Sequence, residues 1–253
     1  MAKIGKKETE SKRAEEHKNR IAAAKARRRA GTTLERPEPS LTIKPSILIY
    51  CEGENTEPSY FNKFKVSSAT VKAFGEGKNT LSLVQEAIKI AKKAEDDGKP
   101  FDKVWCVFDA DPKPDNPSQL QNFNKAVALG NKVGFNTAYS NQAFEYWLIL
   151  HFEDHQGGSM PRTDYDKKLN HYLKPYKIAY DGSGSKIVTQ EMFRVLFEQV
   201  DTDKNGYSIT RCDVASARAE KIFNYHAPHT NPGNEESSTL VHRLVEELIE
   251  YSK

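Results

Sequence analysis

Two apolar segments of the chain end in acidic side chains, and these acids are the residues best suited to chemistry. Glu52 follows the apolar run at residues 46–51, and Asp109 and Asp111 follow the run at residues 104–108. Runs of this length, rich in Ile, Val and aromatic residues, are typical of parallel strands buried on both faces. Ligands bind at the carboxyl ends of such strands, so two neighbouring strands would bring the three acids together. Clustered carboxylates repel one another unless a cation neutralises them, which predicts a hard divalent cation, Mg²⁺.

Three motifs in this order also resemble a known pattern. A strand that ends in Glu-Gly, followed by a strand that ends in Asp-x-Asp, resembles the Toprim domain shared by topoisomerases, primases and several nucleases. From about Arg36 to the C-terminus, the chain is similar to the RloB family of bacterial phage-defence and restriction-linked proteins. The resemblance implies that Glu52, Asp109 and Asp111 are catalytic and bind metal, and similarity to the nuclease branch adds Glu57 as a metal ligand. The matching segments are Cys51-Glu52-Gly53-Glu54-Asn55-Thr56-Glu57-Pro58-Ser59-Tyr60-Phe61, Phe108-Asp109-Ala110-Asp111 and Ser140-Asn141-Gln142-Ala143-Phe144-Glu145-Tyr146-Trp147-Leu148-Ile149-Leu150-His151-Phe152.

These acids together suggest a hydrolytic mechanism. Alternate residues of an extended chain point the same way, so Asp109 and Asp111 would hold one Mg²⁺, for which Mn²⁺ could substitute. Glu52 would complete that shell or act as a general acid or base. Glu57, at the start of the next helix, would support a second metal and permit two-metal phosphodiester hydrolysis.

The elements that must position these residues alternate between strands and helices. Strands are expected at residues 46–51, 71–74, 103–108 and 135–139, with helices at 80–94 and 120–130 between them. This order predicts a parallel sheet with right-handed crossovers. The fold class is therefore α/β, and the resemblance makes it a Toprim-like (Rossmann-like) parallel sheet flanked by helices, with a helical C-terminal extension. The C-terminal helices are expected at residues 165–173, 191–200, 208–225 and 237–251.

The third motif contains two further candidates, Glu145 and His151, which the family pattern includes. Its apolar residues have helical spacing, so the segment could simply be a core helix. A carboxylate in such a helix needs a partner, and Glu145 would pair with a basic side chain, accept from backbone amides or face the metal site. Glu145, His151 and Asn141 are therefore candidates for a shell behind the metal ligands.

A glycine-rich loop at residues 182–186 ends in Lys186. It lacks the order of a P-loop and no buried strand precedes it, which favours a flexible loop over a nucleotide site. The resemblance, however, places a Tyr and a downstream Lys here, matched by Tyr180 and Lys186. A lysine that reaches a phosphate could stabilise the charge that develops during strand cleavage, so Lys186 is a catalytic candidate.

Residues 201–206 begin like an EF-hand calcium loop. Acidic or amide side chains occupy the first, third and fifth positions and Gly206 the sixth. The twelfth position, which requires a bidentate Glu, is Cys212. The segment is therefore interpreted as a polar turn between two helices.

The first 40 residues form a basic arm. Between Met1 and Arg36 the sequence has 12 Lys and Arg against 5 Glu, and a proline-containing linker follows. Without an apolar face the arm cannot offset its ordering entropy and is expected to be disordered or only nascently helical when alone. It would either follow a nucleic-acid backbone or only increase solubility. The expected organisation is this arm (1–40), a Toprim-like core (41–155) and a mainly helical region (156–253), and the candidate nucleic-acid contacts are Lys25, Arg27, Arg28 and Arg29.

Composition narrows the class of protein. The chain has 253 residues and a net charge of +3, enough for one large or two small domains. The three cysteines, Cys51, Cys106 and Cys212, have no zinc spacing and are expected to be reduced core residues. No stretch near twenty apolar residues and no signal peptide is visible, which predicts a soluble protein of the bacterial cytoplasm without a membrane partner.

Three functions remain open. The first is an Mg²⁺-dependent nuclease of an anti-phage, abortive-infection system, acting on DNA or RNA, with transfer RNA as a plausible substrate. The second is a non-catalytic module that binds nucleic acid or a partner defence protein. The third is nucleotidyl transfer, as in primases. The expected partners are nucleic acid, another protein of the defence system or a second copy of the chain in a homodimer.

Overall fold

The structure is a computed structural model that describes residues 15, 18–20, 22, 44–75, 79–113, 116, 118–156 and 158–252. The candidate nucleic-acid contacts Lys25, Arg27, Arg28 and Arg29, and the expected disorder of the arm, lie outside the described residues. From Lys44 onward the chain forms one compact unit.

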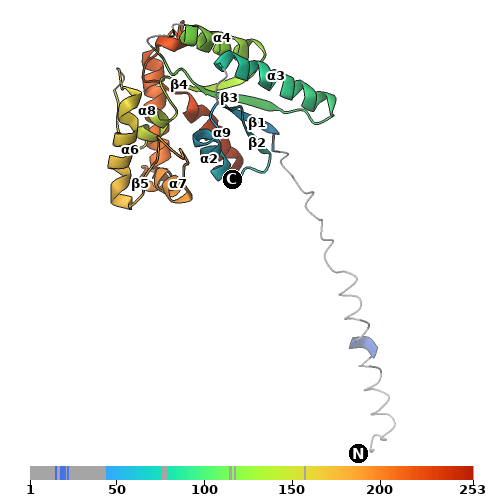
Figure 1. Cartoon of the computed structure of the whole chain (residues 1–253). Helices are drawn as coiled ribbons and strands as arrows, with labels where there is room; N and C mark the ends of the chain where they lie inside the picture. The colour runs from blue at the N-terminus through green and yellow to red at the C-terminus, as the bar shows by residue number, and fades with distance from the viewer. Residues whose placement is uncertain are drawn as a thin grey trace, which may run out of the picture. The chain divides into compact units, whose positions relative to one another are not determined.

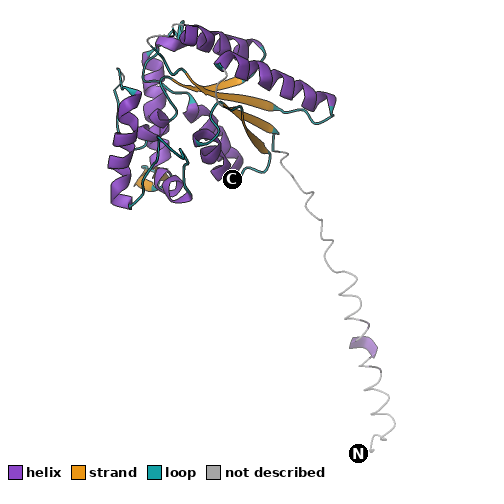
Figure 2. Ribbon diagram, viewed as in Figure 1, coloured by secondary structure: helices purple, strands orange, loops and turns teal. Residues whose placement is uncertain are grey.

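A four-stranded parallel sheet is the centre of this unit, with strand order β2-β1-β3-β4. Figure 2 shows its strands between layers of helices. The α/β fold with a parallel sheet is thus confirmed, and each strand lies within one or two residues of its expected position. The strands are β1 (Ile47–Cys51), β2 (Ala69–Ala73), β3 (Lys103–Asp109) and β4 (Asn136–Ser140).

The two central strands are buried on both faces because every side chain of their apolar runs meets a helix layer. In β1, Ile47 and Ile49 belong to one hydrophobic cluster, whereas Leu48 and Tyr50 belong to the other. This alternation follows from the two-residue period of a strand. Figure 1 shows α3 and α4 along one face of the sheet, and α2 and α9 on the opposite side.

Helices surround the sheet and form most of the C-terminal part. The expected helix at 80–94 is α3, which begins after Asn79, whose side chain accepts from the Ser82 N–H at 2.9 Å and so caps a free backbone donor. The helices are α2 (Thr56–Phe61), α3 (Thr80–Asp96), α4 (Ser118–Lys132), α5 (Glu145–Leu150), α6 (Tyr165–Leu173), α7 (Gln190–Leu196), α8 (Arg211–Tyr225) and α9 (Val241–Ser252), with single 3₁₀ turns η1 (Asn62–Phe64), η2 (Arg162–Asp164), η3 (Lys174–Tyr176) and η4 (Pro232–Asn234).

The EF-hand-like segment is the tip of a β-hairpin. Strands β5 (Gln199–Thr202) and β6 (Ser208–Thr210) pair antiparallel, so the expectation that helices extend to residue 200 and resume at 208 was wrong. Asp203 Oδ1 accepts from the Asn205 and Tyr207 amides at 2.9 and 2.7 Å, which closes the hairpin turn. Its carboxylate thus serves the turn rather than pointing into a ligand loop.

The C-terminal helices share a core with the sheet. One hydrophobic cluster joins Ile49 of β1 and Trp147 of α5 to Leu169 of α6 and Leu244 of α9. The three cysteines are free and buried, as expected. Within the described residues, every helix is too short or too polar to cross a bilayer.

Candidate active site at the carboxyl edge of the sheet

A cavity of about 540 Å³ opens where β1 and β3 end. The two strands are direct neighbours in the sheet, so the residues that follow them emerge side by side. Acidic and basic side chains meet there, which is the mixture required to bind both a cation and a phosphate. The acids that line the cavity are Glu52, Glu54, Glu57, Asp109, Asp111 and Glu145, and the basic residues are Lys113, Arg162 and Lys186.

Glu52 links the ends of the two strands. The Glu52 amide donates to the Val107 carbonyl at 2.9 Å, and the Asp109 amide donates to Glu52 Oε2 at 3.0 Å. Burial raises the pKa of Glu52, and the charge of Asp111 adds to this, whereas the Asp109 amide and Arg162 oppose it. The carboxylate is therefore held in place and is easier to protonate than a solvated one.

Asp109 is the last residue of β3 and faces the start of α5. Its Oδ2 accepts from the Phe144 amide at 3.1 Å. Burial raises the pKa of Asp109 well above its ordinary value, and the nearby charges of Glu57 and Glu52 raise it further. The folded protein thus confines a carboxylate among other carboxylates, which costs stability unless a cation or a proton compensates.

Glu57 is buried in the first turn of α2, with only 5% of its surface exposed. Burial raises its pKa to about 7, with contributions from the charges of Glu145 and Glu52, while its own backbone amide and that of Gly53 lower it. A Cβ at Gly53 would lie 2.3 Å from Glu57 Oε2. Gly53 therefore leaves room for this carboxylate, and any larger residue there would require the Glu57 side chain to move.

Asp111 lines the same cavity but departs from the expected geometry. Its φ of 39° is left-handed, so the chain from Asp109 to Asp111 is not extended and the argument from alternating side chains was wrong. Arg162 Nη1 donates to Asp111 Oδ1 at 2.7 Å, and Lys113 Nζ lies 3.3 Å from Oδ2. Asp111 is thus an ion-paired carboxylate at the edge of the site.

Arg162 is a member of the site that sequence reasoning missed. Burial lowers its pKa, but the charges of Asp109, Asp111 and Glu145 more than offset burial, so the net shift is upward. It is the residue whose charge opposes the raised pKa of Asp109. A single Arg after a proline in a loop has no periodicity or motif, so only the fold reveals its place.

Glu145 finds its partner in Tyr180. The Tyr180 hydroxyl donates to Glu145 Oε1 at 2.8 Å and lies 3.2 Å from Thr56 Oγ1. The two hydroxyl-bearing residues are buried. This contact joins the start of α2, the start of α5 and the C-terminal part at one point, so Tyr180 fixes the position of Glu145 at the cavity wall.

We expect Tyr180→Phe to lower the free energy of unfolding by about 1–3 kcal/mol, because it leaves the buried Glu145 oxygen without a donor and the buried Thr56 hydroxyl without an acceptor. Urea unfolding would measure the change, with Tyr225→Phe as a control because Tyr225 is 78% exposed. The same loss in a Glu145→Leu background, which has no oxygen to accept the bond, would show that the hydroxyl does not act through this carboxylate.

His151 and Asn141 are placed away from the cavity. His151 Nδ1 lies 3.0 Å from the Trp147 carbonyl of its own helix, and burial lowers its pKa to about 3, so the ring is neutral. The Asn141 side-chain amide donates to the carbonyls of Pro232 and Gly233 at 3.2 and 3.3 Å. Neither side chain lines the cavity, and the hydrogen bonds of both are made elsewhere.

Lys186 does line the cavity. It lies at the end of a glycine-rich loop whose conformation is held by hydrogen bonds to Asp181. Asp181 accepts from the amides of Gly184 and Ser185, both at 2.9 Å, and its carbonyl accepts from the Lys186 amide at 2.9 Å. These bonds close the glycine-rich loop into a compact turn. Lys186 therefore enters the site from a structured turn rather than from an extended loop.

The carboxylates of the cavity are the type of ligand that suits a hard divalent cation, but their side chains do not yet converge on one point. Carboxylate oxygens are the ligands that Mg²⁺ and Mn²⁺ take in proteins. Among the described residues, no three Asp, Glu, His or Cys side chains converge closely enough to hold a metal ion. Asp111 would have to exchange Arg162 or Lys113 for the metal, whereas Glu52, Glu57 and Asp109 already share the wall.

Fold and site together define a parallel α/β protein that gathers carboxylates at the carboxyl edge of its sheet. The model of the RloB-like protein family matches residues 47–248, so the chain belongs to that family. The match includes both strands that carry the acids, the Tyr180 contact and most of α9. A comparison with curated proteins finds none that matches the chain.

Proposed function

We propose that this protein is an Mg²⁺-dependent nuclease of the Toprim type, acting in a bacterial anti-phage, abortive-infection system. The observation that supports it best is one cavity in which carboxylates from neighbouring strands have raised pKa values and stand beside Arg162 and Lys186. Acids that repel one another are stabilised by a cation, and basic side chains at the same place suit a phosphate. Family membership agrees with this proposal.

Each residue of the cavity would have a distinct role in the hydrolysis. The metal, bound by Glu52, Glu57, Asp109 and Asp111, would supply a Lewis acid for the phosphate and lower the pKa of attacking water. Glu52, whose pKa burial raises, would complete the metal shell or act as the general acid or base. Lys186 and Arg162 would orient the phosphate and oppose the charge that develops on it. Glu145, whose position is fixed by the Tyr180 hydroxyl, would lie behind the metal ligands and help to keep them in place.

The substrate would be DNA or RNA, and transfer RNA is the first choice among RNAs. The basic arm, with Lys25 and Arg27 to Arg29, would add contacts to the phosphate backbone. A partner protein of the same defence system, or a second copy of the chain in a homodimer, would control when the site is active.

We expect the parent protein to cleave at least one substrate in a panel of plasmid DNA, single-stranded DNA and total transfer RNA, with Mg²⁺ or Mn²⁺. A variant with Asp109→Ala and Asp111→Ala should be at least 100-fold slower, because removing the ligands removes the charge stabilisation. EDTA should stop the parent, and an Asp96→Ala variant, changed on the exposed end of α3, should cleave normally. Full activity of the double variant would refute the proposal.

A second candidate is a non-catalytic module that binds nucleic acid or a partner protein. The ion pairs of Asp111 with Arg162 and Lys113 favour it, because they occupy a carboxylate that metal chemistry needs. In that case the double variant would still protect cells against phage, and deletion of residues 1–36 would abolish protection. Loss of protection in the double variant, with the truncated protein still active, would exclude this second candidate.

A further inference from the structure

One face of the α6 segment carries basic side chains that no acid neutralises. The stretch at residues 167–180 contains no Asp or Glu. Of its basic residues, Lys168 is paired with Glu153 at 2.7 Å. The other four are exposed. Lys167 and His171 of α6 and Lys174 at the start of η3 follow one another at spacings of four and three residues, which places them on one side of the helical segment. Lys177 comes directly after η3, with a left-handed φ of 57°. We call these four the basic face of α6: Lys167, His171, Lys174 and Lys177.

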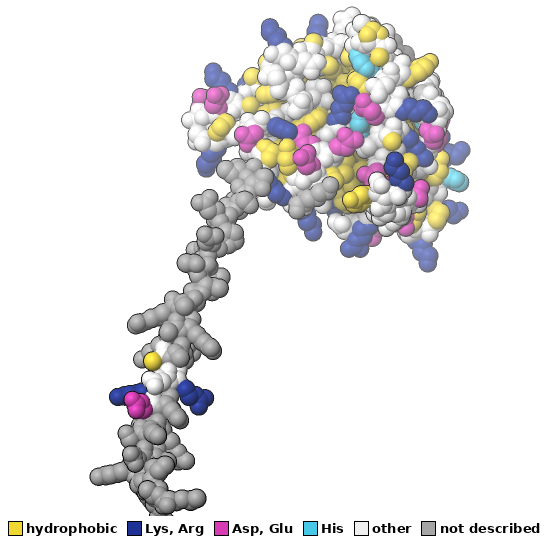
Figure 3. All heavy atoms as spheres, turned by 180° about the vertical axis from the view of Figure 1, so that it is seen from behind, with side chains coloured by type: hydrophobic (Ala, Val, Ile, Leu, Met, Phe, Trp, Pro, Cys, Tyr) yellow, Lys and Arg dark blue, Asp and Glu magenta, His cyan; other side chains and the backbone are white. Residues whose placement is uncertain are grey.

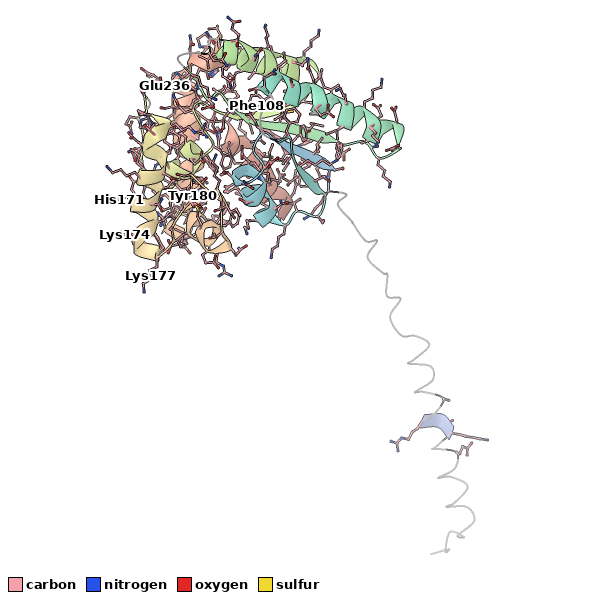
Figure 4. All side chains as sticks on the ribbon, in the orientation of Figure 1. Phe108, His171, Lys174, Lys177, Tyr180 and Glu236 are labelled. Carbon is pink, nitrogen blue, oxygen red and sulfur yellow. The ribbon has the colours of Figure 1, made fainter. Side chains whose placement is uncertain are left out.

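This face differs from the basic part of α3 in the acids that neighbour it along the sequence. Within the described residues, none of its four side chains forms a salt bridge. On α3, by contrast, Lys89 pairs with Glu86, and Glu95 and Asp96 follow the next lysines. Figure 4 shows His171, Lys174 and Lys177 in succession along the outer edge of the molecule, with Tyr180 on the inner side of the segment. Figure 3 shows blue side chains and a cyan one along the margin where α6 lies, with some magenta side chains among them.

The segment is attached to the candidate active site at both of its ends. Arg162 of η2, just before α6, lines the cavity and pairs with Asp111. After Lys177 the chain turns back along the helix, because Tyr180 and Asn170 exchange hydrogen bonds at 2.8 and 2.9 Å. Further on, the Gly182 amide donates to Asp166 at 3.1 Å. The chain thus returns to the cavity at Lys186, and the basic face leads away from it.

We propose that the basic face of α6 binds the sugar-phosphate backbone of a nucleic acid whose scissile phosphate lies in the cavity. This inference rests on the proposed function. Lys167 and Lys174 are seven residues apart, about 10 Å along the axis at 1.5 Å per residue, which matches a strand of about three nucleotides at 3.4 Å each. Lys177, just after η3, extends the row. Lysine and histidine side chains with no acidic partner are free to contact phosphates, and such contacts are independent of base sequence.

The inference is tested by binding, independently of cleavage. A Lys167→Gln/Lys174→Gln/Lys177→Gln variant is compared with Lys92→Gln/Lys93→Gln/Lys99→Gln, which removes the same charge from exposed positions on and just after α3. Both are made in an Asp109→Asn background, with EDTA. Fluorescence anisotropy with labelled single-stranded RNA, single-stranded DNA and duplex DNA, at several salt concentrations, measures Kd and the salt dependence of binding.

We expect the α6 variant to bind at least 10-fold more weakly, and its slope of log K against log salt to become shallower by about 2, since each lost single-strand phosphate contact accounts for about 0.7. The α3 variant should change Kd less than 2-fold. Equal effects of the two variants, unchanged binding by the α6 variant, or no binding by the parent would each overturn the inference. The preferred probe distinguishes RNA from DNA.

A cleavage assay separates this inference from the nuclease proposal. Bis(p-nitrophenyl) phosphate is too small to reach α6 from the cavity, so the α6 substitutions, made with Asp109 intact, should leave its hydrolysis unchanged. Selective loss of nucleic-acid binding in the α6 variant would support the surface even if the parent protein cleaved nothing. If the parent cleaves nucleic acid and the α6 variant binds it as the parent does, the nuclease proposal stands and the proposed binding surface on α6 is refuted.

Discussion

Asp109→Asn is expected to yield a protein that is more stable than the parent without metal and no longer responds to Mg²⁺. Burial and the charges of Glu57 and Glu52 raise the pKa of Asp109, so its ionised form is unfavourable in the folded state at neutral pH. Asn removes that charge and keeps an oxygen to accept from the Phe144 amide, which Asp109 binds at 3.1 Å. We expect the gain in unfolding free energy to be on the order of 1 kcal/mol, because neighbouring carboxylates are relieved as well.

The metal response should be the larger difference. A cation that binds the folded state alone stabilises it by about 2.7 kcal/mol when present at 100 times its Kd. The parent should therefore melt at a higher temperature with Mg²⁺ or Mn²⁺ than with EDTA, and Asp109→Asn should show no shift. Asp96→Asn, changed at an exposed position, is the matched control and should behave like the parent. If Asp109→Asn were destabilised in EDTA and still gained stability from Mg²⁺, the carboxylate would be neither strained nor a ligand.

The positions of Glu52 and Asp109 were predictable because they depend on local patterns. Each follows a continuous apolar run that is long enough for a strand but too short for a helix, and parallel pairing of those strands brings their ends together. The fold of the sheet followed from the same runs, and the helix at Thr80–Asp96 from its apolar spacing. Hydrophobic periodicity encodes these features in a single stretch of chain.

The rest of the site depends on contacts between distant segments. Arg162 reaches Asp111 across 51 residues, and Tyr180 reaches Glu145 across 35. The left-handed backbone at Asp111 could not be inferred because Asp is common in both extended and turn conformations. The hairpin before α8 was missed since its strands are short, exposed and polar, so they have no periodic apolar pattern.

The acids of the cavity explain why a cation bound there would increase the stability of the folded protein. The sheet edge gathers carboxylates that a protein would otherwise keep apart, and Arg162 opposes only part of their repulsion. The fold tolerates this repulsion because burial of the two apolar clusters, which lie on opposite faces of β1 and β3, stabilises the folded state. The raised pKa values of Glu57 and Asp109 thus reflect a cost in stability, and proton uptake should reveal that cost.

We expect the metal-free protein to lose stability because of Glu57 as the pH rises from about 4.5 to about 7. The pKa of Glu57 is about 7 in the folded protein against 4.5 for an ordinary glutamate, so in this range the folded state binds a proton that the unfolded state has lost. Stability falls wherever the folded state binds more protons than the unfolded state. The shift corresponds to roughly 3 kcal/mol, complete above pH 7, at 1.36 kcal/mol per pKa unit.

The comparison of the parent with Glu57→Gln isolates this effect. His151, whose pKa is lowered to about 3 by burial, changes stability in the opposite direction below pH 6.5. The pH curve of the parent alone therefore sums these two effects with those of other shifted groups, such as Glu52 and Asp109. The difference in unfolding free energy between variant and parent, from urea unfolding in EDTA at pH 5, 6, 7 and 8, should increase with pH and level off above 7. Saturating Mg²⁺ should remove most of that difference at pH 8 by stabilising the ionised parent. A difference that stays constant from pH 5 to pH 8 would show that Glu57 titrates as an ordinary surface carboxylate.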